Sequence, residues 1–413
     1  MSDAAMAMPL DFNYEDPRVD PYPTYARLRE QSPVARVRGP RMWNQAYLVT
    51  RYDDVLSLLK DPRFSTEMHH RFKSADNPFP WWLRLLAQRF NVFGSNMLGM
   101  DDPGHARLRN LVQKAFTPAL VQNLHGRIEQ ITEDLLDRMQ GKHDVDLIAD
   151  FALPLPMTVI SEMLGVPEEE RMRFRHYAKD IVHFRGGTWG VLRRVLNRGR
   201  MVRYFHGLID YRRKNPDGQL ISLLVQAEQS GDRLTAQELV AMVFLLLFAG
   251  HETTVNLIGN GMLALLDHPD QLALLRDRPD LVRSAVEELL RFTNPVEHGM
   301  PRVTLEEVEI QGVKIPPYSL VLAMLSAANR DPSMFSNAET LDITRDPNRH
   351  IAFGIGIHYC LGAPLARLEG AVAFNALLRR FPNLQLAVPR DQIRWRPPSL
   401  VRALEALPVR LNG

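Results

Sequence analysis

Hydrophobic positions spaced three and four residues apart predict a mainly helical chain. Helices are expected over residues 21–30, 52–60, 102–116, 120–139, 151–164, 235–266 and 280–292, and from Gly362 to Phe381. Alternating runs predict short strands over residues 46–50, 143–147, 305–310 and 319–325, the last two joined by a turn at Gly312 and Pro316-Pro317. The pattern therefore predicts a mainly α fold with a minor β region.

Two segments, residues 64–100 and 329–349, show little periodicity. The first contains the neighbouring tryptophans Trp81 and Trp82, and its aromatic content argues against disorder. A segment of this length without regular structure often serves a function. We expect it to form a wall or lid of a binding pocket; the alternative is that the two tryptophans fill the core.

The helix expected from Thr235 carries polar groups in the middle of an apolar run. It begins with a capping box that ends at Glu238, and its longest apolar run, residues 239–250, is too short to cross a bilayer. The following Glu252 and Thr253 place an acid and an alcohol inside this helix, which costs free energy unless a partner or water compensates. Ala249 lies four residues before Thr253 and shares its face. This predicts either a functional groove or a kinked core helix whose threonines bond to their own backbone.

The only cysteine lies in the stretch from Phe353 to Gly362, which reads Phe-Gly-Ile-Gly-Ile-His-Tyr-Cys-Leu-Gly. Its three glycines permit tight turns and the close approach of a flat ligand. Cys360 precedes a predicted helix, and the N-terminus of a helix favours a thiolate. A zinc site would need further Cys or His ligands nearby, so haem iron is the metal that fits best. The alternative is that Cys360 is one more small buried residue.

This stretch resembles the cysteine-ligand loop of the cytochrome P450 haem-thiolate monooxygenases, with matches at Phe353, Gly354, Gly356, His358, Cys360 and Gly362. The resemblance covers nearly the whole chain. It implies a triangular helical prism around a buried haem b, with Cys360 as the axial iron ligand. It also implies a single domain over residues 1–413, with a flexible tail at residues 1–12 and no fused reductase domain.

The resemblance assigns roles to residues outside the loop. Glu252 and Thr253 match the oxygen-activation motif, and Glu288 with Arg291 matches a buried structural pair on the proximal side of haem. His105 and Arg109 lie one helical turn apart, where they would contact a haem propionate unless they form an exposed polar face. The residues implied to contact haem are Cys360, His105, Arg109, Arg302, His358, Phe353, Gly354, Gly362, Ala249, Gly250 and Leu98. Those implied to line the substrate pocket are Trp81, Trp82, Phe184, Leu245, Val296, Glu297, His298 and Leu400.

Composition limits which partners and which cellular location are expected. The chain has 413 residues, 45% of them hydrophobic, and a net charge of +2, which suits a soluble globular protein and gives no reason to expect nucleic acid. One cysteine excludes an intramolecular disulfide. No signal peptide or membrane anchor is evident, so a cytoplasmic monomer is expected. Because nothing resembles a flavin or iron–sulfur domain, we expect a ferredoxin and a ferredoxin reductase to deliver electrons from NAD(P)H, docking through basic residues such as Arg107, Lys114 and Arg367.

The expected reaction is the insertion of one oxygen atom from O2 into a hydrophobic or amphiphilic small molecule, by hydroxylation or epoxidation. Two alternatives remain open: a peroxide-driven enzyme or haem isomerase, and a haem-binding sensor or carrier without catalysis. The basic region of residues 171–214 either binds an anionic substrate group or is solvated surface. The substrate itself is not indicated, because such a fold does not dictate its ligand.

Overall fold

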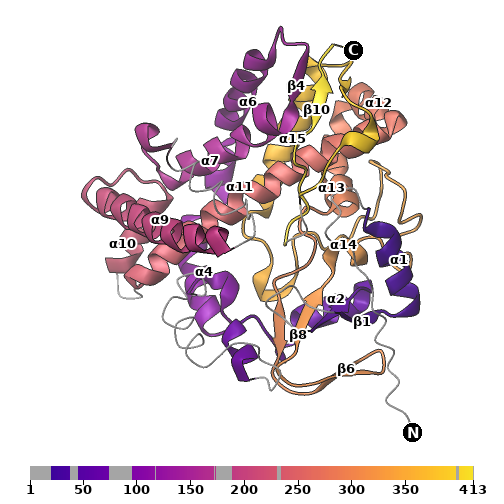
Figure 1. Ribbon diagram of the computed structural model, residues 1–413. Helices are drawn as coiled ribbons and strands as arrows, with labels where there is room; N and C mark the ends of the chain where they lie inside the picture. Colours follow the sequence, from indigo (N-terminus) through magenta and orange to yellow (C-terminus); the bar gives the residue numbers. More distant parts are fainter. Residues whose placement is uncertain are drawn as a thin grey trace. The chain divides into compact units, whose positions relative to one another are not determined.

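The computed structural model describes residues 20–37, 45–73, 95–116, 118–171, 173, 188–229, 234–396 and 400–412, and is drawn in Figure 1. Trp81, Trp82 and Phe184, expected to line the substrate pocket, lie outside these residues. The chain divides into two compact units that alternate along the sequence. The first consists of Met1–Phe90, Thr132–Ala152 and Thr253–Gly413, and the second of Asn91–Ile131 and Leu153–Glu252.

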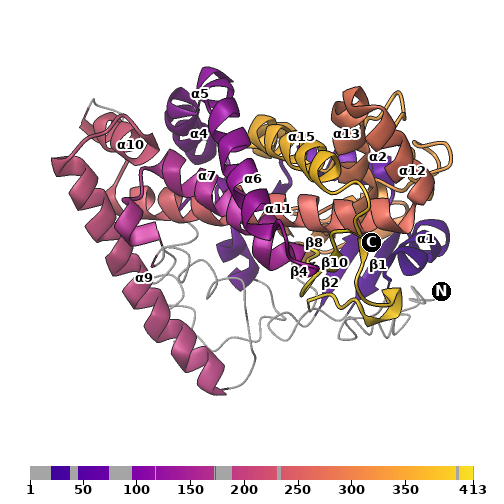
Figure 2. The ribbon, with the colours of Figure 1, turned by 90° about the horizontal axis from the view of Figure 1, so that it is seen from above.

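Helices dominate the first unit. Those lying wholly within it are α1 (Tyr22–Gln31), α2 (Tyr52–Lys60), α12 (Pro269–Asp277), α13 (Val282–Thr293), α14 (Leu325–Ala328) and α15 (Ala363–Arg380). Short turns of other helix types are η1 (Met68–Lys73), η3 (Ile148–Ala152), η5 (Pro279–Leu281), η6 (Gly356–His358) and η7 (Arg390–Gln392). In Figures 1 and 2, α13 lies beside α15, and the two helices pack against each other. The segment that contains Cys360 lies directly before α15 in the sequence.

The described residues of the second unit form helices and no strand. They are η2 (Met97–Gly99), α4 (Gly104–Ala115), α5 (Pro118–Asn123), α7 (Pro154–Leu164), η4 (Glu168–Glu170), α9 (Thr188–Lys214) and α10 (Leu220–Gln229). Two further helices, α6 (His125–Met139) and α11 (Ala236–Asp267), contribute residues to both units. The single helix predicted over residues 120–139 is therefore two helices, and α7 begins at Pro154, because proline is favoured in the first turn of a helix.

Three small sheets belong to the first unit. The largest has the order β1-β2-β8-β5-β3, formed by Val34–Val37, Ala46–Val49, Leu320–Ala323, Arg302–Thr304 and Phe64–Ser65. β2 and β8 run parallel, and the other pairs in this sheet are antiparallel. A second sheet has the order β4-β10-β9, formed by Asp144–Asp146, Pro408–Arg410 and Gln385–Leu386. The third is the hairpin of β6 (Val308–Ile310) and β7 (Val313–Ile315).

This hairpin corrects the strand pairing expected from the sequence. Val313–Ile315 was expected to be part of the turn, but it is a strand that pairs with β6. Gln311 and Gly312, with φ of 51° and 75°, form the two-residue turn, which suits the right-handed twist of the strands. β8 pairs instead with β2 and β5. The sequence signal was weakened because glutamine is an unusual residue at positive φ.

Glu288 and Arg291 form a buried ion pair on α13, as predicted. Arg291 donates from Nε and Nη2 to the two carboxylate oxygens of Glu288, both at 2.8 Å, and each side chain is 0% exposed. Arg291 also donates to the carbonyl oxygens of Asn329 (2.9 Å), Ala338 (2.8 Å) and Thr340 (3.0 Å). One guanidinium therefore fixes a segment with no regular secondary structure to α13.

Glu288 receives further hydrogen bonds from the same segment. Its carboxylate accepts from the backbone N–H of Asp342 at 3.0 Å, from Arg345 Nε at 3.1 Å and from Asn348 Nδ2 at 3.1 Å. Burying a charge is tolerated only when it is paired and hydrogen-bonded in this way. The network holds residues 329–348, the approach to the cysteine stretch, against α13.

Replacing Arg291 by methionine should lower the free energy of unfolding by about 3–5 kcal/mol, because it leaves the Glu288 carboxylate buried without its main partner. Chemical denaturation followed by circular dichroism measures this loss. The matched control is Arg278→Met, which breaks the exposed pair with Asp280 and should leave the free energy of unfolding nearly unchanged, because water screens exposed charges. Equal losses in the two variants would contradict a structural role for the buried network.

Candidate active site

The segment from Phe353 to Gly362 forms a tight loop in front of α15. Cys360 N–H donates to the carbonyl oxygen of Phe353 at 3.0 Å, which closes the loop on itself. Gly354 and Gly356 have φ of 67° and 74°, in the left-handed region that favours glycine. A Cβ atom at Gly356 would also lie 3.3 Å from the carbonyl oxygen of Leu59 on α2. The two glycines are thus required by the backbone path of the loop.

Cys360 lies three residues before α15 and is partly exposed. α15 has 18 residues with a proline in its first turn, and the positive end of its dipole favours a thiolate over a thiol. The neighbouring Ile357 and Tyr359 are 42% and 40% exposed. A small core residue would be surrounded by packed side chains, so the structure excludes that alternative for Cys360. Cys360 is thus partly exposed and lies where a thiolate is stabilised, as a metal ligand requires.

Arg367 of α15 connects this loop to α13. It donates to both carboxylate oxygens of Glu287, from Nε at 2.6 Å and from Nη2 at 2.8 Å. Its guanidinium lies 4.4 Å from the centre of the Phe353 ring, within the range of a cation–π contact. His350 Nε2 lies 3.0 Å from the same carboxylate. Burial raises the pKa of Glu287, but hydrogen bonds from Arg367 and His350 outweigh it and lower the pKa to about 2.

This pairing also bears on the expected docking of an electron donor. Arg367 is bound to Glu287, and Arg107 of α4 is bound to Glu238, so both positive charges are already neutralised by carboxylates. The side chain of Lys114 lies outside the described residues. Both arginines are thus ion-paired within the protein, and docking of an electron donor through them stays a prediction.

Among the other residues expected at the site, Arg302, Val296, Glu297, His298 and Leu400 belong to the first unit. Arg302 is buried on β5 and donates to the carbonyl oxygen of Phe64 at 2.9 Å. Val296 bridges Val401, and the N–H of Glu297 donates to the carbonyl oxygen of Leu400 at 2.9 Å. The two segments expected to line the pocket are therefore adjacent.

Of the two residues expected to form a polar pocket wall, Glu297 is buried and His298 is half-exposed. The Glu297 carboxylate accepts hydrogen bonds from the hydroxyls of Tyr25 and Ser326, and its side chain is buried, which favours a structural role. His298 Nδ1 donates to the carbonyl oxygen of Gly299 at 2.7 Å. Burial lowers the pKa of His298, so its ring is favoured in the neutral form.

α11 is buried along its length except around its central motif. From Glu238 to Leu265, every residue is buried apart from Phe244, Phe248, Ala249, Gly250 and Thr253. Ala249 alone is exposed, and Thr253, one turn later on the same face, is half-buried. Leu245, expected to line the pocket, is buried. The uncovered turn thus lies at the motif that the sequence singled out.

Glu252 and Gly250 have defined surroundings within the second unit. Glu252 is 2% exposed, and its Oε2 lies 3.8 Å from His251 Nε2. Nδ1 of His251 donates to the carbonyl oxygen of Leu247 at 2.6 Å. A Cβ atom at Gly250 would lie 2.9 Å from Cδ1 of Ile160 on α7. The glycine is explained by this close helix packing.

His105 and Arg109, also in the second unit, lie one turn apart on α4 as predicted. His105 is 2% exposed and its Nδ1 lies 3.3 Å from Asp102 Oδ1. Burial lowers the pKa of His105 more than Asp102 raises it. Leu98 is half-buried in η2, where its N–H donates to the side chain of Asn96 at 2.9 Å. The alternative of an exposed polar face is excluded for His105, since its ring is buried.

Glu369 is a buried acid that the sequence interpretation missed. It lies on α15 among the buried residues Leu365 and Ala373, four positions to either side, and is 1% exposed. Burial raises the pKa of Glu369 to about 8, and the Thr254 hydroxyl of α11 opposes only part of this shift. The sequence does contain a signal for this buried acid, because Glu369 stands at a position where the helical spacing predicts an apolar residue. Thr254 directly follows Thr253, a residue of the predicted oxygen-activation motif.

The elevated pKa of Glu369 predicts a pH-dependent stability. Below about pH 4.5 the acid is protonated in both states and its contribution is fully present; it is lost as the pH rises toward 8, because only the unfolded state ionises in this window. Glu369→Gln should therefore flatten the decrease in unfolding free energy between pH 5 and 8, a difference of the order of a few kcal/mol. Urea denaturation of the haem-loaded protein at several pH values measures it.

The control is Glu309→Gln, which changes an exposed acid and should leave the pH dependence unaltered. A Glu369→Gln variant with the same pH dependence as the parent would show that Glu369 is ionised in the folded protein.

Comparison with known proteins identifies the family. The family model described as Cytochrome P450 matches residues 67–401. "Polyketide biosynthesis cytochrome P450 PksS" of Bacillus subtilis is 43% identical over 395 residues, covering 95% of this chain and 96% of that protein. "6-deoxyerythronolide B hydroxylase" of Saccharopolyspora erythraea is 42% identical over 408 residues, covering 98% and 99%.

Solved structures support the same assignment. A structure of PksS from Bacillus subtilis aligns with a TM-score of 0.88 at 42% identity, covering 96% of this chain and 99% of that chain. The myxobacterial cytochrome P450 CYP267B1 in complex with myristic acid aligns with a TM-score of 0.89 at 42% identity, covering 96% and 97%. These matches confirm the mainly helical fold predicted from the sequence. The chain belongs to the cytochrome P450 family.

Proposed function

We propose that this monooxygenase hydroxylates or epoxidises an apolar or amphiphilic small molecule of polyketide type, with electrons from a separate ferredoxin and ferredoxin reductase. The observation that carries the proposal of haem-thiolate chemistry is the partly exposed thiol of Cys360 in front of α15. The substrate class is supported by the similarity, over nearly the whole chain, to PksS and to 6-deoxyerythronolide B hydroxylase.

The residues present fit a haem. Cys360 is accessible, its loop is held by Arg367 and Phe353, and glycines keep the backbone of that loop free of side chains. Cys360 would bind the iron, while His105, Arg109 and Arg302 would bind the propionates through charge-assisted hydrogen bonds. The remaining contacts would come from Leu98, Ala249, Gly250, Phe353, Gly354, His358 and Gly362. Haem with a thiolate ligand, when bound, supplies the redox chemistry that activates O2.

Thr253 and Glu252 would supply protons to this chemistry. Thr253 is half-buried one turn after the exposed Ala249, and its hydroxyl would hold a proton at this uncovered turn of α11. Glu252 is buried and lies 3.8 Å from His251 Nε2. The Glu252 carboxylate would relay protons toward Thr253, the next residue of α11.

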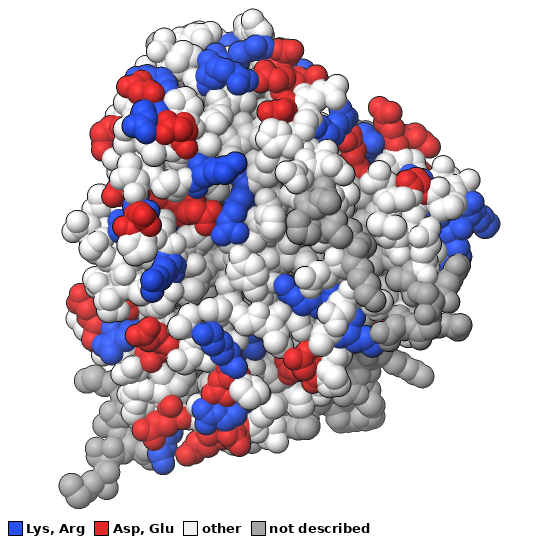
Figure 3. Space-filling model, turned by 180° about the vertical axis from the view of Figure 1, so that it is seen from behind, with Lys and Arg blue, Asp and Glu red and all other residues white. Residues whose placement is uncertain are grey.

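The partners and the location follow from the composition and the surface. Within the part of the chain that the structure describes, one helix, α11, is long and apolar enough to cross a membrane, but 72% of its apolar window is buried inside the protein, as in a core helix. We propose a cytoplasmic monomer without a nucleic-acid partner. On the face in Figure 3, acidic and basic side chains alternate over the described surface. An electron donor that docks there would be recognised by local charge pairs and not by a broad basic surface.

Replacing Thr253 by alanine should uncouple the reaction, because the side chain then donates no proton. The assay contains ferredoxin, ferredoxin reductase, NAD(P)H and a compound selected by its shift of the ferric spectrum. We expect the rate of product formation to fall about 10²–10⁴-fold, and the amount of product formed per NAD(P)H consumed to fall as well. Product analysis and oxygen uptake measure this. Thr253→Ser keeps the hydroxyl and should retain most of the coupling.

The same assay decides between the alternatives. Turnover with peroxide and none with the ferredoxin system would favour a peroxide-driven enzyme or isomerase. Stable oxygen binding by the ferrous protein, without oxidation of any compound that shifts its spectrum, would favour a sensor or carrier. Full coupling in Thr253→Ala would contradict the proton-donating role of this hydroxyl.

A further inference from the structure

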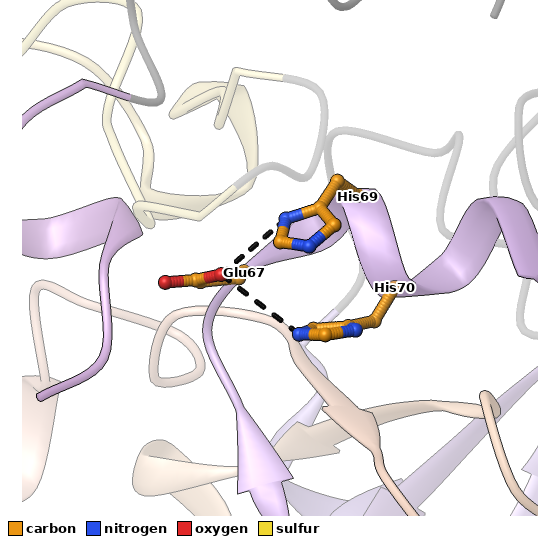
Figure 4. Close-up of side chains that lie close together, drawn as sticks. All are labelled: Glu67, His69 and His70. Atoms are coloured by element: carbon orange, nitrogen blue, oxygen red, sulfur yellow. Dashed lines mark ion pairs between the residues drawn. The ribbon is translucent and has the colours of Figure 1, made fainter.

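We propose that Glu67, His69 and His70 form a binding site for a divalent transition-metal ion such as Zn²⁺, separate from the haem chemistry. Among the residues that the structure describes, these three are the group whose His and carboxylate ligand atoms all lie within 4.8 Å of one another. Figure 4 shows both imidazole rings turned toward the Glu67 carboxylate. The roles proposed above for the monooxygenase reaction do not include these three side chains.

The distances between ligand atoms suit a small tetrahedral ion. Glu67 Oε2 lies 3.4 Å from His69 Nδ1 and 3.8 Å from His70 Nε2. Zinc binds nitrogen and oxygen at about 2.0–2.2 Å, so two ligand atoms on a tetrahedral ion lie about 3.4 Å apart. One carboxylate oxygen is thus the common neighbour of two imidazole nitrogens at nearly the spacing that a shared ion imposes.

The chemistry of the three ligands selects the class of ion. Two imidazoles and one carboxylate are ligands that zinc uses in proteins, leaving a fourth position for water. Imidazole also suits copper and nickel, whereas magnesium and calcium prefer oxygen ligands. The rings of His69 and His70 lie with their centres 4.1 Å apart. Two protonated imidazoles at this separation would repel each other, while two neutral imidazoles can both bind a cation through their lone pairs.

The backbone already holds the ligands in place. β3 ends at Ser65 and pairs with β5 through Phe64 and Ser65. The N–H of Glu67 donates to Ser65 Oγ at 3.0 Å, and the N–H of His70 donates to the carbonyl oxygen of Glu67 at 3.1 Å. A site whose ligands are fixed before binding loses less entropy when the ion arrives.

Nearby charge is compatible with a cation. Arg71, the next residue after the cluster, is buried, and its Nη1 donates to the carbonyl oxygen of Tyr318 at 3.1 Å. This bond directs its charge toward the β5–β8 side of the sheet. The Glu67 and His69 side chains are 31% and 49% exposed, so an ion can reach the ligands from solvent. The bound ion would fix the first turn of η1 to the strand before it.

Calorimetric titration of the haem-loaded protein with ZnCl₂, after removal of trace metal, tests the site. We expect one equivalent of Zn²⁺ to bind, and Glu67→Gln, His69→Gln and His70→Gln each to weaken binding by at least about tenfold. The haem keeps Cys360 occupied, so the thiol does not compete for zinc. The matched control is His125→Gln, which removes a histidine 3.5 Å from Glu129 in a pair that has no third ligand among the described residues.

Hydrogen exchange locates the ion independently. Zn²⁺ should slow exchange of the His70 amide, which closes the first turn of η1, and should have no such effect in His69→Gln. An unchanged ferrous carbonyl spectrum in each variant shows that the fold is intact, so a loss of zinc binding is attributable to the ligand. Equal zinc affinity in the parent and all three ligand variants, or an equal loss in His125→Gln, would overturn the proposal.

Discussion

The hydrogen-bonded pair of Arg367 and Glu287 is the interaction on which the rest of the site depends. It joins α15 to α13 and places the guanidinium against Phe353, the first residue of the cysteine loop. The next residue on α13, Glu288, binds Arg291 and the segment that leads into the loop. Two neighbouring acids on one helix thus hold the loop and its approach from different sides. The thiol of Cys360 can remain accessible because its backbone is fixed by these contacts.

Much of this could be predicted from local sequence. The helices follow from apolar spacing, the capping box at Thr235 is present with Glu238 Oε2 accepting from the Thr235 N–H at 2.8 Å, and Glu288 pairs with Arg291 because they are three residues apart. The turn of α11 that the motif marked is the part of that helix left uncovered. These features are determined by residues within a few positions of one another.

Features that depend on distant contacts could not be predicted. The partner of Arg367 lies 80 residues away, and Gly250 is explained by Ile160 on another helix. The β6–β7 hairpin was missed because its turn uses glutamine at positive φ. Glu369 lies on an apolar helix face that the sequence shows, but the burial that raises its pKa is not visible in local periodicity. The partner of Arg367 and the packing at Gly250 likewise depend on tertiary contacts, which local periodicity does not encode.

The central claim is that Cys360 is the thiolate ligand of a haem, and the carbon monoxide spectrum of the reduced protein tests it most directly. The parent protein should show the red-shifted band of a thiolate-bound ferrous carbonyl, because the sulfur donates electron density to the iron. Cys360→Ser should lose this band while haem remains bound. A Cys360→Ser protein that kept the parent's red-shifted band would contradict the account.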